Sequence, residues 1–455
     1  MLREKIYERK NWRSVIHMTW DPDGPDVIRI HMVPPRFQPF RKVPSVAILN
    51  GQELLPLNES WAILFTEFAN AVNLHGEGAM SSRDLNEILQ KTFEQVKKVF
   101  PGVSDEMLKE DLLAIMDTFQ AVARGEIPEV EIGGMSLADY AKNMTAPHRM
   151  DLMVSAMTVN GAWHCNQKCL HCYAADQKLS EVPELPTEEW KKIIAACRKA
   201  RIPQLTFTGG EPTLRRDLCE LIKEARWFVT RLNTNGVLLS PELCRNLKEA
   251  ELDSVQVTFY SEKETVHNGL VGADNYKKTV DGIKNALAAG LNLSVNTPLC
   301  TKNSEYKDTL AFLHGLGVTY VTCSGLIVTG NARKAESEQT QLSEEELYQI
   351  LQDAAAYCYA NGMEIAFTSP GWISEEKLLE IGLSVPSCGA CLSNMAITPD
   401  GRVVPCQSWL EGETLGDMRT EKFERIWKRA ACRKHRAYAA KNTKNCPLRD
   451  KEGKE

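Results

Sequence analysis

Hydrophobic spacing divides the chain into three stretches, and the first ends near residue 145. Short apolar runs in VIRIHMVPP and PSVAILNGQELLPL predict strands, and Asn50-Gly51 inside the second run predicts a hairpin turn. Apolar residues at helical spacing then predict three helices, at about 59–72, 82–99 and 104–124. Two strands followed by three helices indicate a small winged-helix-like α/β domain over residues 1–145.

From about residue 150 the pattern changes to alternating strands and helices. Strand-like runs recur in DLMVSAMTVN, QLTFTGGEP, FVTRLNTNG, SVQVTFYS, NLSVNTPL and VTYVTCSG, with amphipathic runs between them. This alternation predicts a parallel sheet with right-handed crossovers. About six βα units predict an open, partial (β/α)6 TIM-type barrel over residues 150–362. Because chemistry in such barrels gathers at the carboxyl ends of the strands, polar residues at those ends are the candidates for a site.

The third stretch, residues 363–455, begins with MEIAFTSP, which predicts a strand, and continues with a cysteine-rich segment and a helical tail. We interpret it as a small C-terminal cysteine-rich α+β domain. The predicted fold class is therefore α/β, a partial barrel flanked by two smaller domains.

Composition narrows the class of protein. The 455 residues are 43% hydrophobic and 25% charged, with a net charge of -6, as in ordinary globular proteins. This charge gives no reason to expect nucleic acid or an anionic membrane as a partner. No apolar run is long enough to span a bilayer, and MLREKIYERKNWRS lacks the apolar core of a secretory signal. We therefore expect a cytoplasmic location and no membrane partner.

The 14 cysteines are unevenly distributed along the chain. None precedes Cys165, three lie close together in WHCNQKCLHCYAADQ, and five lie near the end. The remaining six lie singly in mostly apolar or helical surroundings, and we interpret them as core residues. These six are Cys197, Cys219, Cys244, Cys300, Cys323 and Cys358.

The first cluster, Cys165, Cys169 and Cys172, has the spacing C-x3-C-x2-C. Structural zinc sites have four nitrogen or sulfur ligands, so a zinc site that borrows His171 or His164 is one interpretation. An iron–sulfur cubane is the other, because three thiolates leave one of its four irons with an open position. In metal enzymes an open position receives a reactant.

This spacing after a barrel strand resembles the radical S-adenosylmethionine (radical SAM) superfamily. The resemblance implies that the three cysteines hold a [4Fe–4S] cluster whose open iron binds SAM. It implies that one electron from the cluster cleaves SAM to methionine and a 5′-deoxyadenosyl radical, which takes hydrogen from the substrate. His171 matches a position near the adenine in that family, and Tyr173 follows it as in many members, so both are predicted cofactor-binding residues. A reductant such as flavodoxin or ferredoxin is implied as a partner.

Other segments resemble SAM-binding elements of the same family. FTGGEPTLRRDL resembles its GGEP segment, where glycines let the backbone approach a ligand and a carboxylate can hold the SAM ammonium group. LNTNG resembles a polar segment after the third strand. Thr258 lies where many members have serine, although Tyr260 replaces an aspartate of many relatives. At Asn233, Asn235, Thr258 and Asn296, the alternative interpretation is a turn-forming residue or a buried polar residue that already has its hydrogen-bond partners. The predicted cofactor-binding set is Gly209, Gly210, Glu211, Asn233, Asn235, Thr258 and Asn296.

The C-terminal cysteines form a second candidate centre. The segment CGACLSNMAITPDGRVVPC reads C-x2-C-x14-C, and its Pro-Asp-Gly turn predicts a hairpin that returns Cys406 toward Cys388 and Cys391. Zinc is an alternative here as well. In a radical SAM chain this stretch resembles a SPASM/twitch domain, which implies one auxiliary [4Fe–4S] cluster. Cys446 is the predicted fourth ligand and Cys432 its rival. The third alternative is an open auxiliary iron that binds substrate, as in the similar molybdenum-cofactor GTP cyclases.

The substrate is suggested only by the N-terminal domain. ILNGQELLPLNESWAILFTEF loosely resembles the PqqD-like peptide-recognition element of ribosomal peptide maturases, which binds a leader peptide at a strand edge. This likeness implies a ribosomally synthesised peptide with a leader as substrate, crosslinked or modified at a residue. Small-molecule cofactor biosynthesis of tetrapyrrole or pterin type is the alternative. A non-catalytic zinc- or cluster-binding scaffold is a weaker alternative, because it leaves the GGEP segment unexplained.

Overall fold

A computed structural model describes most of the chain, and its residues fold as two compact units. The first is built mainly from residues up to 146, and the second mainly from residues 147–455. The predicted turn at Asn50-Gly51 lies outside the described residues. No helix in the described part of the chain is both long enough and apolar enough to cross a bilayer. The described residues are 7, 16–20, 28–33, 45–49, 53–75, 81–123, 126–130, 144–412, 414–442 and 444–449.

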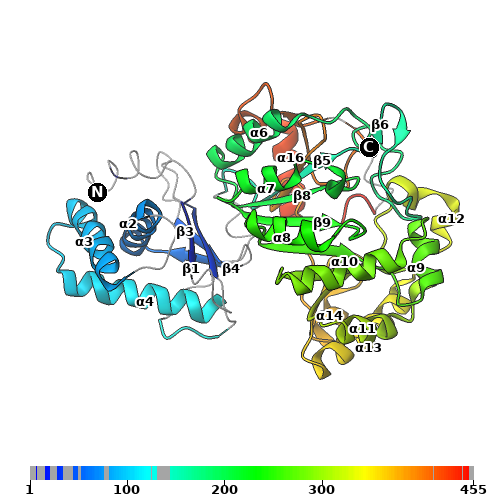
Figure 1. The fold of residues 1–455 in the computed structure, drawn as a ribbon, viewed down its shortest axis with the longest axis horizontal. Helices are drawn as coiled ribbons and strands as arrows, with labels where there is room; N and C mark the ends of the chain where they lie inside the picture. The colour runs from blue at the N-terminus through cyan, green and yellow to red at the C-terminus, as the bar shows by residue number, and fades with distance from the viewer. Residues whose placement is uncertain are drawn as a thin grey trace. The chain divides into compact units, whose positions relative to one another are not determined.

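The first unit is an antiparallel sheet followed by three helices (Figure 1). The three predicted helices are confirmed to within a few residues. The structure adds a strand, β1, that sequence analysis did not single out, although the alternation of apolar and polar residues in IHMTW is typical of a strand. The elements are β1 (Ile16–Trp20), β2 (Ile28–Val33), β3 (Ser45–Leu49), β4 (Glu53–Leu57), α2 (Glu59–His75), α3 (Ser82–Val99) and α4 (Asp105–Ala123).

The core of this first unit lies between the sheet and α2. Phe65 of α2 is fully buried and meets Phe119 of α4 edge-on, with 5.1 Å between ring centroids. At the start of α3, the Ser81 side chain accepts from the Asp84 N–H and the Asp84 carboxylate accepts from the Ser81 N–H. Such a capping box satisfies backbone donors that the first helical turn leaves free.

The second unit is built on one ten-stranded sheet in the order β13-β12-β11-β10-β9-β8-β5-β14-β15-β16. All pairings from β9 to β13 are parallel, which confirms the predicted partial barrel. The strands are β5 (Arg149–Ser155), β8 (Gln204–Gly209), β9 (Val229–Thr234), β10 (Ser254–Thr258), β11 (Leu293–Pro298), β12 (Tyr320–Ser324), β13 (Glu364–Phe367), β14 (Asn394–Ile397), β15 (Arg402–Val404) and β16 (Gly416–Asp417). A small hairpin, β6 (Thr158–Val159) with β7 (Ala162–Trp163), follows β5.

Strands of the cysteine-rich C-terminal stretch extend the barrel sheet. β14 pairs in parallel with β5, with Asn394 opposite Arg149, although the two strands are far apart in the sequence. β15 then pairs antiparallel with β14, which confirms the predicted hairpin before Cys406. The segment that carries the C-terminal cysteines is therefore joined directly to the strand that leads into the first cysteine cluster.

Helices lie between the strands along the chain or follow the last one, and α7, α8 and α10 are visible beside the sheet in Figure 1. They are α6 (Thr187–Lys199), α7 (Leu218–Glu224), α8 (Pro241–Glu249), α9 (Glu264–Val271), α10 (Tyr276–Ala288), α11 (Tyr306–Gly315), α12 (Ala335–Glu338), α13 (Glu344–Ala360), α14 (Glu375–Glu380), α15 (Phe423–Trp427) and α16 (Ala430–Lys441). Short 3-10 turns are η1 (Pro212–Leu214), η2 (Thr301–Asn303) and η3 (Gly330–Arg333).

Polar side chains alternate with apolar ones along the central barrel strands and hydrogen-bond to one another across them. Val255 and Val257 of β10 are fully buried, whereas Gln256 between them donates to the Thr322 hydroxyl on β12 at 3.2 Å. That hydroxyl in turn donates to Asn296 Oδ1 at 2.8 Å. TIM-type barrels are ordinarily filled by branched apolar residues. This polar network suits a barrel interior that binds polar ligands.

A buried histidine predicts a measurable pH dependence of stability. His267 in α9 is fully buried, its Nδ1 accepts from the Tyr260 N–H, and its ring lies 4.8 Å from that of Phe259. Burial lowers the pKa of His267 to about 4. Below pH 6.5 the His267 imidazole therefore binds a proton in the unfolded chain but not in the folded chain. We expect His267 alone to contribute a loss of about 1–2 kcal/mol in unfolding free energy between pH 6.5 and pH 5.

Denaturant unfolding at both pH values measures this loss. His267→Gln should unfold with a smaller pH dependence, because its replacement has no proton to gain. His314→Gln, which replaces a partly exposed histidine, should keep the pH dependence of the parent protein. An equal loss of stability in the parent and in His267→Gln would contradict the assignment.

Candidate functional site

The first cysteine cluster lies in a loop after β7 that backbone hydrogen bonds hold in place. The N–H groups of Lys168 and Leu170 donate to the carbonyls of Val271 and Leu270 at the end of α9, at 2.9 and 2.8 Å. The Trp163 indole N–H donates to the Gln167 carbonyl at 2.9 Å. The loop therefore has a defined shape that comes from the chain itself.

A segment after β12 clamps the same loop from another direction. Asn331 donates its backbone N–H to the Cys172 carbonyl at 2.9 Å and its side-chain amide to the Cys169 carbonyl at 3.1 Å. The Ser337 hydroxyl donates to the Leu170 carbonyl at 3.0 Å. Sequence analysis missed Asn331 and Ser337, because they lie about 160 residues from the cysteines and belong to no motif.

The three thiols are half-buried and lie close to one another. Burial raises the pKa of Cys165 to about 12, and the neighbouring Cys172 and Cys165 thiols add to the increase in the pKa of Cys169. A bound cationic cluster reverses this preference, because a metal deprotonates the thiols that coordinate it. The thiols would thus bind such a cluster as thiolates.

Neither candidate histidine completes a four-ligand zinc site with these thiols. His171 Nε2 lies 2.7 Å from the Thr340 hydroxyl, and burial lowers the His171 pKa to about 4. His164 Nε2 lies 3.9 Å from the Glu184 carboxylate instead. Among the described residues, no three His, Cys, Asp or Glu side chains lie close enough together to hold a single metal ion. A cubane holds its thiolates through several irons and fits the looser spacing better than one zinc ion does.

Glu211 accepts four hydrogen bonds at the carboxyl end of the barrel. Its side chain is 1% exposed, and Oε1 accepts from the Thr213 N–H, the Thr213 hydroxyl and the Thr234 hydroxyl at 2.5–3.0 Å. Oε2 accepts from the Asn235 N–H at 2.8 Å. Burial raises the pKa of this carboxyl, and the four donors act in the opposite direction. The carboxylate is thus held rigidly, and its role in binding the SAM ammonium group stays a prediction.

The two glycines before Glu211 have a packing role that needs no ligand. Gly209 has φ +137°, and a Cβ atom there would lie 2.2 Å from the Ser155 carbonyl oxygen. A Cβ atom at Gly210 would lie 2.7 Å from the Ala156 carbonyl oxygen. The Gly210 N–H donates to the Ser155 carbonyl at 2.8 Å. Only glycine lets β8 approach the end of β5 this closely.

One of the predicted asparagines, Asn235, connects Glu211 to the cysteine loop. Asn235 Nδ2 donates to Asn166 Oδ1 at 2.6 Å, and Asn166 is the residue after Cys165. Thr258 pairs with Asn296 across β10 and β11, so both lie at the same level of the sheet. The structure therefore gathers Glu211, Asn235 and the cysteine loop by direct hydrogen bonds.

Several buried polar atoms around the cysteine loop have no hydrogen-bond partner among the described residues. They are Ser155 Oγ, Asn166 Nδ2, Gln167 Nε2 and Asn233 Oδ1. Leaving a buried donor or acceptor unpaired is costly, so such atoms mark places where a polar ligand binds. Both donors and acceptors are present, which fits a ligand with amino, carboxylate and hydroxyl groups such as SAM.

Tyr173, the residue after the last cysteine of the loop, lies between the two cysteine-rich regions. Burial raises the pKa of its phenol, and both Cys172 and Cys406 are close enough to add to the shift. The Thr208 hydroxyl hydrogen-bonds to it and acts against the shift. Tyr173 packs with Cys165 and Cys172 against Met153 and neighbouring apolar residues. Its predicted contact with the cofactor stays a prediction.

All five C-terminal cysteines come together in the structure. The hairpin β14–β15 returns Cys406 toward Cys388, and the Cys391 N–H donates to the Pro405 carbonyl at 3.1 Å. Cys446 lies near enough to both Cys388 and Cys406 to raise their pKa values. These four thiols together match the donor set that an iron–sulfur cluster requires.

Cys432 pairs with a different thiol. The Cys391 thiol hydrogen-bonds to Cys432, which raises the pKa of Cys391 and lowers that of Cys432. Arg436 Nη1 lies 3.5 Å from the Cys432 sulfur, and its guanidinium stacks 3.9 Å above the Trp427 ring. Cys432 thus lies at the edge of the cysteine group beside a fixed positive charge.

A buried glutamine ties the two cysteine-rich regions together. Gln177 is 1% exposed, and its side chain donates to the Ser408 carbonyl at 3.4 Å and accepts from the Leu410 N–H at 3.2 Å. The Leu179 N–H donates to the Leu410 carbonyl at 3.2 Å. The loop after Cys172 and the loop after Cys406 therefore share one hydrogen-bonded framework. Sequence analysis did not single out Gln177, because nothing local distinguishes it.

Comparison with known families gives two matches. Residues 163–316 match the radical SAM superfamily, and residues 388–448 match SPASM, an iron–sulfur cluster-binding domain. Both matches coincide with the two cysteine-rich regions.

Two relatives match part of the chain at less than 30% sequence identity. The chain is 28% identical to a probable GTP 3′,8-cyclase of Methanopyrus kandleri, over 56% of this chain and 81% of that protein. It is 27% identical to an AdoMet-dependent heme synthase of Oleidesulfovibrio alaskensis, over 58% of this chain and 72% of that protein.

Solved structures share the fold at low sequence identity. Streptococcus suis SuiB bound to its precursor peptide SuiA matches with a TM-score of 0.59 and 12% identity, over 90% of this chain and 94% of SuiB. The structure of anSMEcpe with bound AdoMet matches with a TM-score of 0.51 and 14% identity, over 64% of this chain and 83% of anSMEcpe.

Proposed function

Because this chain is a radical SAM enzyme that carries a SPASM domain, we propose that it modifies a ribosomally synthesised peptide. Its cofactors are SAM, the SAM-binding [4Fe–4S] cluster and an auxiliary iron–sulfur cluster. When bound, the first cluster and SAM supply the 5′-deoxyadenosyl radical that abstracts hydrogen from the substrate. The observation that carries the peptide proposal is the fold likeness to peptide-bound SuiB over 90% of the chain, a share too large for the second unit alone.

The residues of this chain fall into three roles in the proposed reaction. Cys165, Cys169 and Cys172 would hold the cluster, and the loop contacts of Asn331 fix their backbone before anything binds. The pair Glu211 and Asn235, joined to the loop through Asn166, would orient the polar groups of SAM. A cytoplasmic reductant of flavodoxin or ferredoxin type would supply the electron.

The first unit offers two sheet edges to a leader peptide. β1 and β4 are the outer strands of its antiparallel sheet. Peptides bind such edges by adding a strand, because the outward N–H and C=O groups pair with the incoming backbone. β4 contains Pro56, which has no N–H to donate, and the His17 carbonyl of β1 already accepts from the Asn73 side chain at 2.7 Å, so each edge offers an incomplete row of groups.

The proposal is tested with a short peptide encoded beside the gene for this chain, added to the reconstituted full-length enzyme under nitrogen. Hydrogen–deuterium exchange should slow at residues 16–20 or 53–57, since edge pairing protects their N–H groups. A mass change in the peptide that requires both SAM and reductant would complete the case. Unchanged exchange and unchanged peptide mass, with SAM still cleaved, would overturn the peptide proposal.

A second candidate function rests on the named relatives. A GTP cyclase and a heme synthase match little more than half of this chain, yet they do so at higher identity than SuiB. Incubation with SAM, reductant and either GTP or an iron coproporphyrin discriminates between the candidates. Conversion of either compound would establish small-molecule chemistry, and its absence alongside peptide modification would exclude it.

The auxiliary cluster predicts a difference between Cys446 and Cys432. We expect Cys446→Ala to lower bound iron from about eight to about four atoms per chain, because Cys446 lies near both Cys388 and Cys406. Cys432→Ala, the matched control, should keep both clusters, since Cys432 hydrogen-bonds to Cys391 and Arg436 at the edge of the group. Iron analysis and electron paramagnetic resonance measure the result. Loss of iron in Cys432→Ala alone would reverse the assignment.

A further inference from the structure

The chain segment around Cys446 lies against the loop that joins β13 to α14. A Cβ atom at Gly371 of this loop would lie 3.2 Å from both the Lys444 carbonyl oxygen and Asn445 Oδ1, so the two backbones pass close together. Gly371 has φ +84°, a conformation that glycine adopts without strain. The Lys444 ammonium also pairs with the Glu375 carboxylate at the start of α14. The loop therefore contacts the segment on the amino-terminal side of Cys446.

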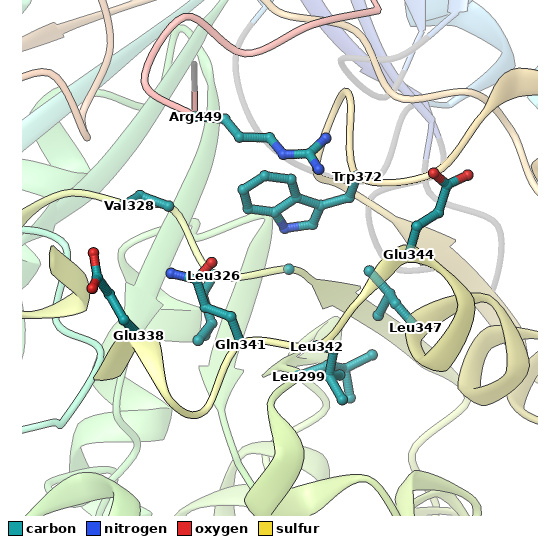
Figure 2. A pocket seen from close by; sticks show the side chains of 11 residues that line it. Leu299, Leu326, Val328, Glu338, Gln341, Leu342, Glu344, Leu347, Trp372 and Arg449 are labelled. Carbon is teal, nitrogen blue, oxygen red and sulfur yellow. The ribbon is translucent and has the colours of Figure 1, made fainter. Parts of the chain in front are cut away.

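On the carboxyl-terminal side of Cys446, Arg449 stacks on Trp372 of the same loop. The Arg449 guanidinium lies 4.1 Å from the centroid of the Trp372 ring, where a cation is attracted to an aromatic face. Figure 2 shows this pair at the edge of a cavity of about 380 Å³. The Arg449 N–H donates to the Cys446 carbonyl at 3.0 Å, so a single turn links the thiol-bearing residue to the stacked guanidinium. One loop thus contacts the chain on both sides of Cys446.

The end of β12 sets the position of the indole. A Cβ atom at Gly325, the residue after β12, would lie 1.3 Å from Trp372 Nε1, so the indole occupies the place where any other side chain would begin. The next residue, Leu326, packs with Cys169 and Leu170 of the first cysteine loop. Trp372 therefore rests on the same strand end that supports the first cysteine loop.

These contacts bear on the auxiliary centre because Cys446 belongs to no helix or strand. α16 ends at Lys441, and residues 444–449 follow it as turns. Even so, the Cys446 thiol lies near enough to Cys388 and Cys406 to raise their pKa values. Groups that support a metal ligand from behind are worth about 10–100-fold in metal affinity. The loop after β13 is in the right place to give that support.

We propose that Trp372 is a positioning residue that holds Cys446 in place as the fourth ligand of the auxiliary cluster. The stack on Arg449 and the close approach at Gly371 fix the segment before the cluster binds, so the thiol already lies beside its partners. Trp372 lies outside both segments that match known families. The inference rests on the assignment of Cys446 as a ligand and does not depend on the substrate.

A chelator challenge of the reconstituted enzyme under nitrogen tests the proposal. Trp372→Ala should lose about four irons, those of the auxiliary cluster, at least about tenfold faster than the parent, because the Cys446 thiol is no longer supported. Trp372→Phe should release iron at nearly the parental rate, since a phenyl ring still accepts the guanidinium stack. Electron paramagnetic resonance should show that both variants keep the signal of the first cluster. Equal loss of both clusters in Trp372→Ala, or equally fast loss in Trp372→Phe, would overturn the proposal.

A second readout uses the protein before reconstitution. Iodoacetamide should alkylate Cys446 at least about tenfold faster in Trp372→Ala than in the parent, because reaction follows local opening of the segment. Mass spectrometry of the peptide that contains Cys446 measures the rate. Cys219 of α7, a half-buried thiol outside both cysteine-rich regions, is the internal reference and should react at the parental rate. Equal alkylation of Cys446 in the parent and in Trp372→Ala would contradict the positioning role.

Two further variants exclude misfolding as the cause. Arg449→Ala removes the same stack without altering the barrel, and it should show the same faster iron release and faster alkylation. Trp227→Ala is the matched control, since Arg198 stacks on the Trp227 ring at 3.9 Å and this residue precedes β9, at the amino ends of the strands. It should behave like the parent. Parent-like behaviour of Arg449→Ala would overturn the proposal even if Trp372→Ala failed to fold.

The results separate this inference from the ligand assignment on which it rests. If Cys446→Ala keeps about eight irons, the ligand assignment fails and the positioning role fails with it. If Cys446→Ala loses the auxiliary cluster while Trp372→Ala and Arg449→Ala behave like the parent, only the positioning role fails. Neither outcome depends on whether the enzyme modifies a peptide, so the proposed substrate is tested separately.

Discussion

Replacing Cys169 with alanine is expected to abolish the cleavage of SAM. Three thiolates leave one iron of a cubane open, and removing one of the three leaves too few ligands to hold the cluster in a reactive state. The rate of 5′-deoxyadenosine formation with a chemical reductant should fall by at least about three orders of magnitude, the scale of losing an essential catalytic group. Chromatography of the products measures it.

Cys219→Ala is the matched control for this loss. Cys219 lies in α7, is also half-buried, and belongs to neither cysteine-rich region. Its replacement should leave iron content and SAM cleavage unchanged. If Cys169→Ala still cleaved SAM at a rate near that of the parent, the assignment of the three-cysteine loop would be wrong.

Gly209→Ala is expected to have the largest effect on folding among the single substitutions considered. Alanine at φ +137° is strained, and its Cβ atom would lie 2.2 Å from the Ser155 carbonyl oxygen. Relieving both problems requires the ends of β8 and β5 to separate, at a cost of about 3 kcal/mol or more. Because Glu211 lies two residues further along the chain, SAM affinity should fall as well.

Denaturant unfolding and SAM binding together check this expectation. Gly269→Ala provides the comparison, since a Cβ atom at this position of α9 meets nothing within 4 Å. Alanine in a helix interior stabilises by up to about 1 kcal/mol relative to glycine, so this control should be neutral or slightly stabilising. A Gly209→Ala protein as stable as the parent would refute the packing argument.

The sequence predicts the roles of these two residues to different extents. The role of Cys169 could be inferred from spacing alone, because C-x3-C-x2-C is a pattern within eight residues. The packing role of Gly209 could not, because it depends on how near another strand passes. Sequence analysis expected the glycines to admit a ligand, and the structure shows that they first admit the backbone of β5.

The same contrast runs through the fold. Helices such as α3 followed from apolar periodicity, which is a local property of the chain. β1 was missed although its alternation of apolar and polar residues is itself a local strand signal. The parallel pairing of β14 with β5 joins residues about 245 positions apart, and no local pattern carries that information.

By itself, the sequence determined the class of chemistry and the order of the elements, because ligand spacing and hydrophobic periodicity are set by neighbouring residues. Only the tertiary structure decided how the parts of the site are held together. The Asn331 clamp and the Gln177 bridge both join residues brought together by folding. Such contacts depend on the path of the whole chain, which is why no sequence motif predicts them.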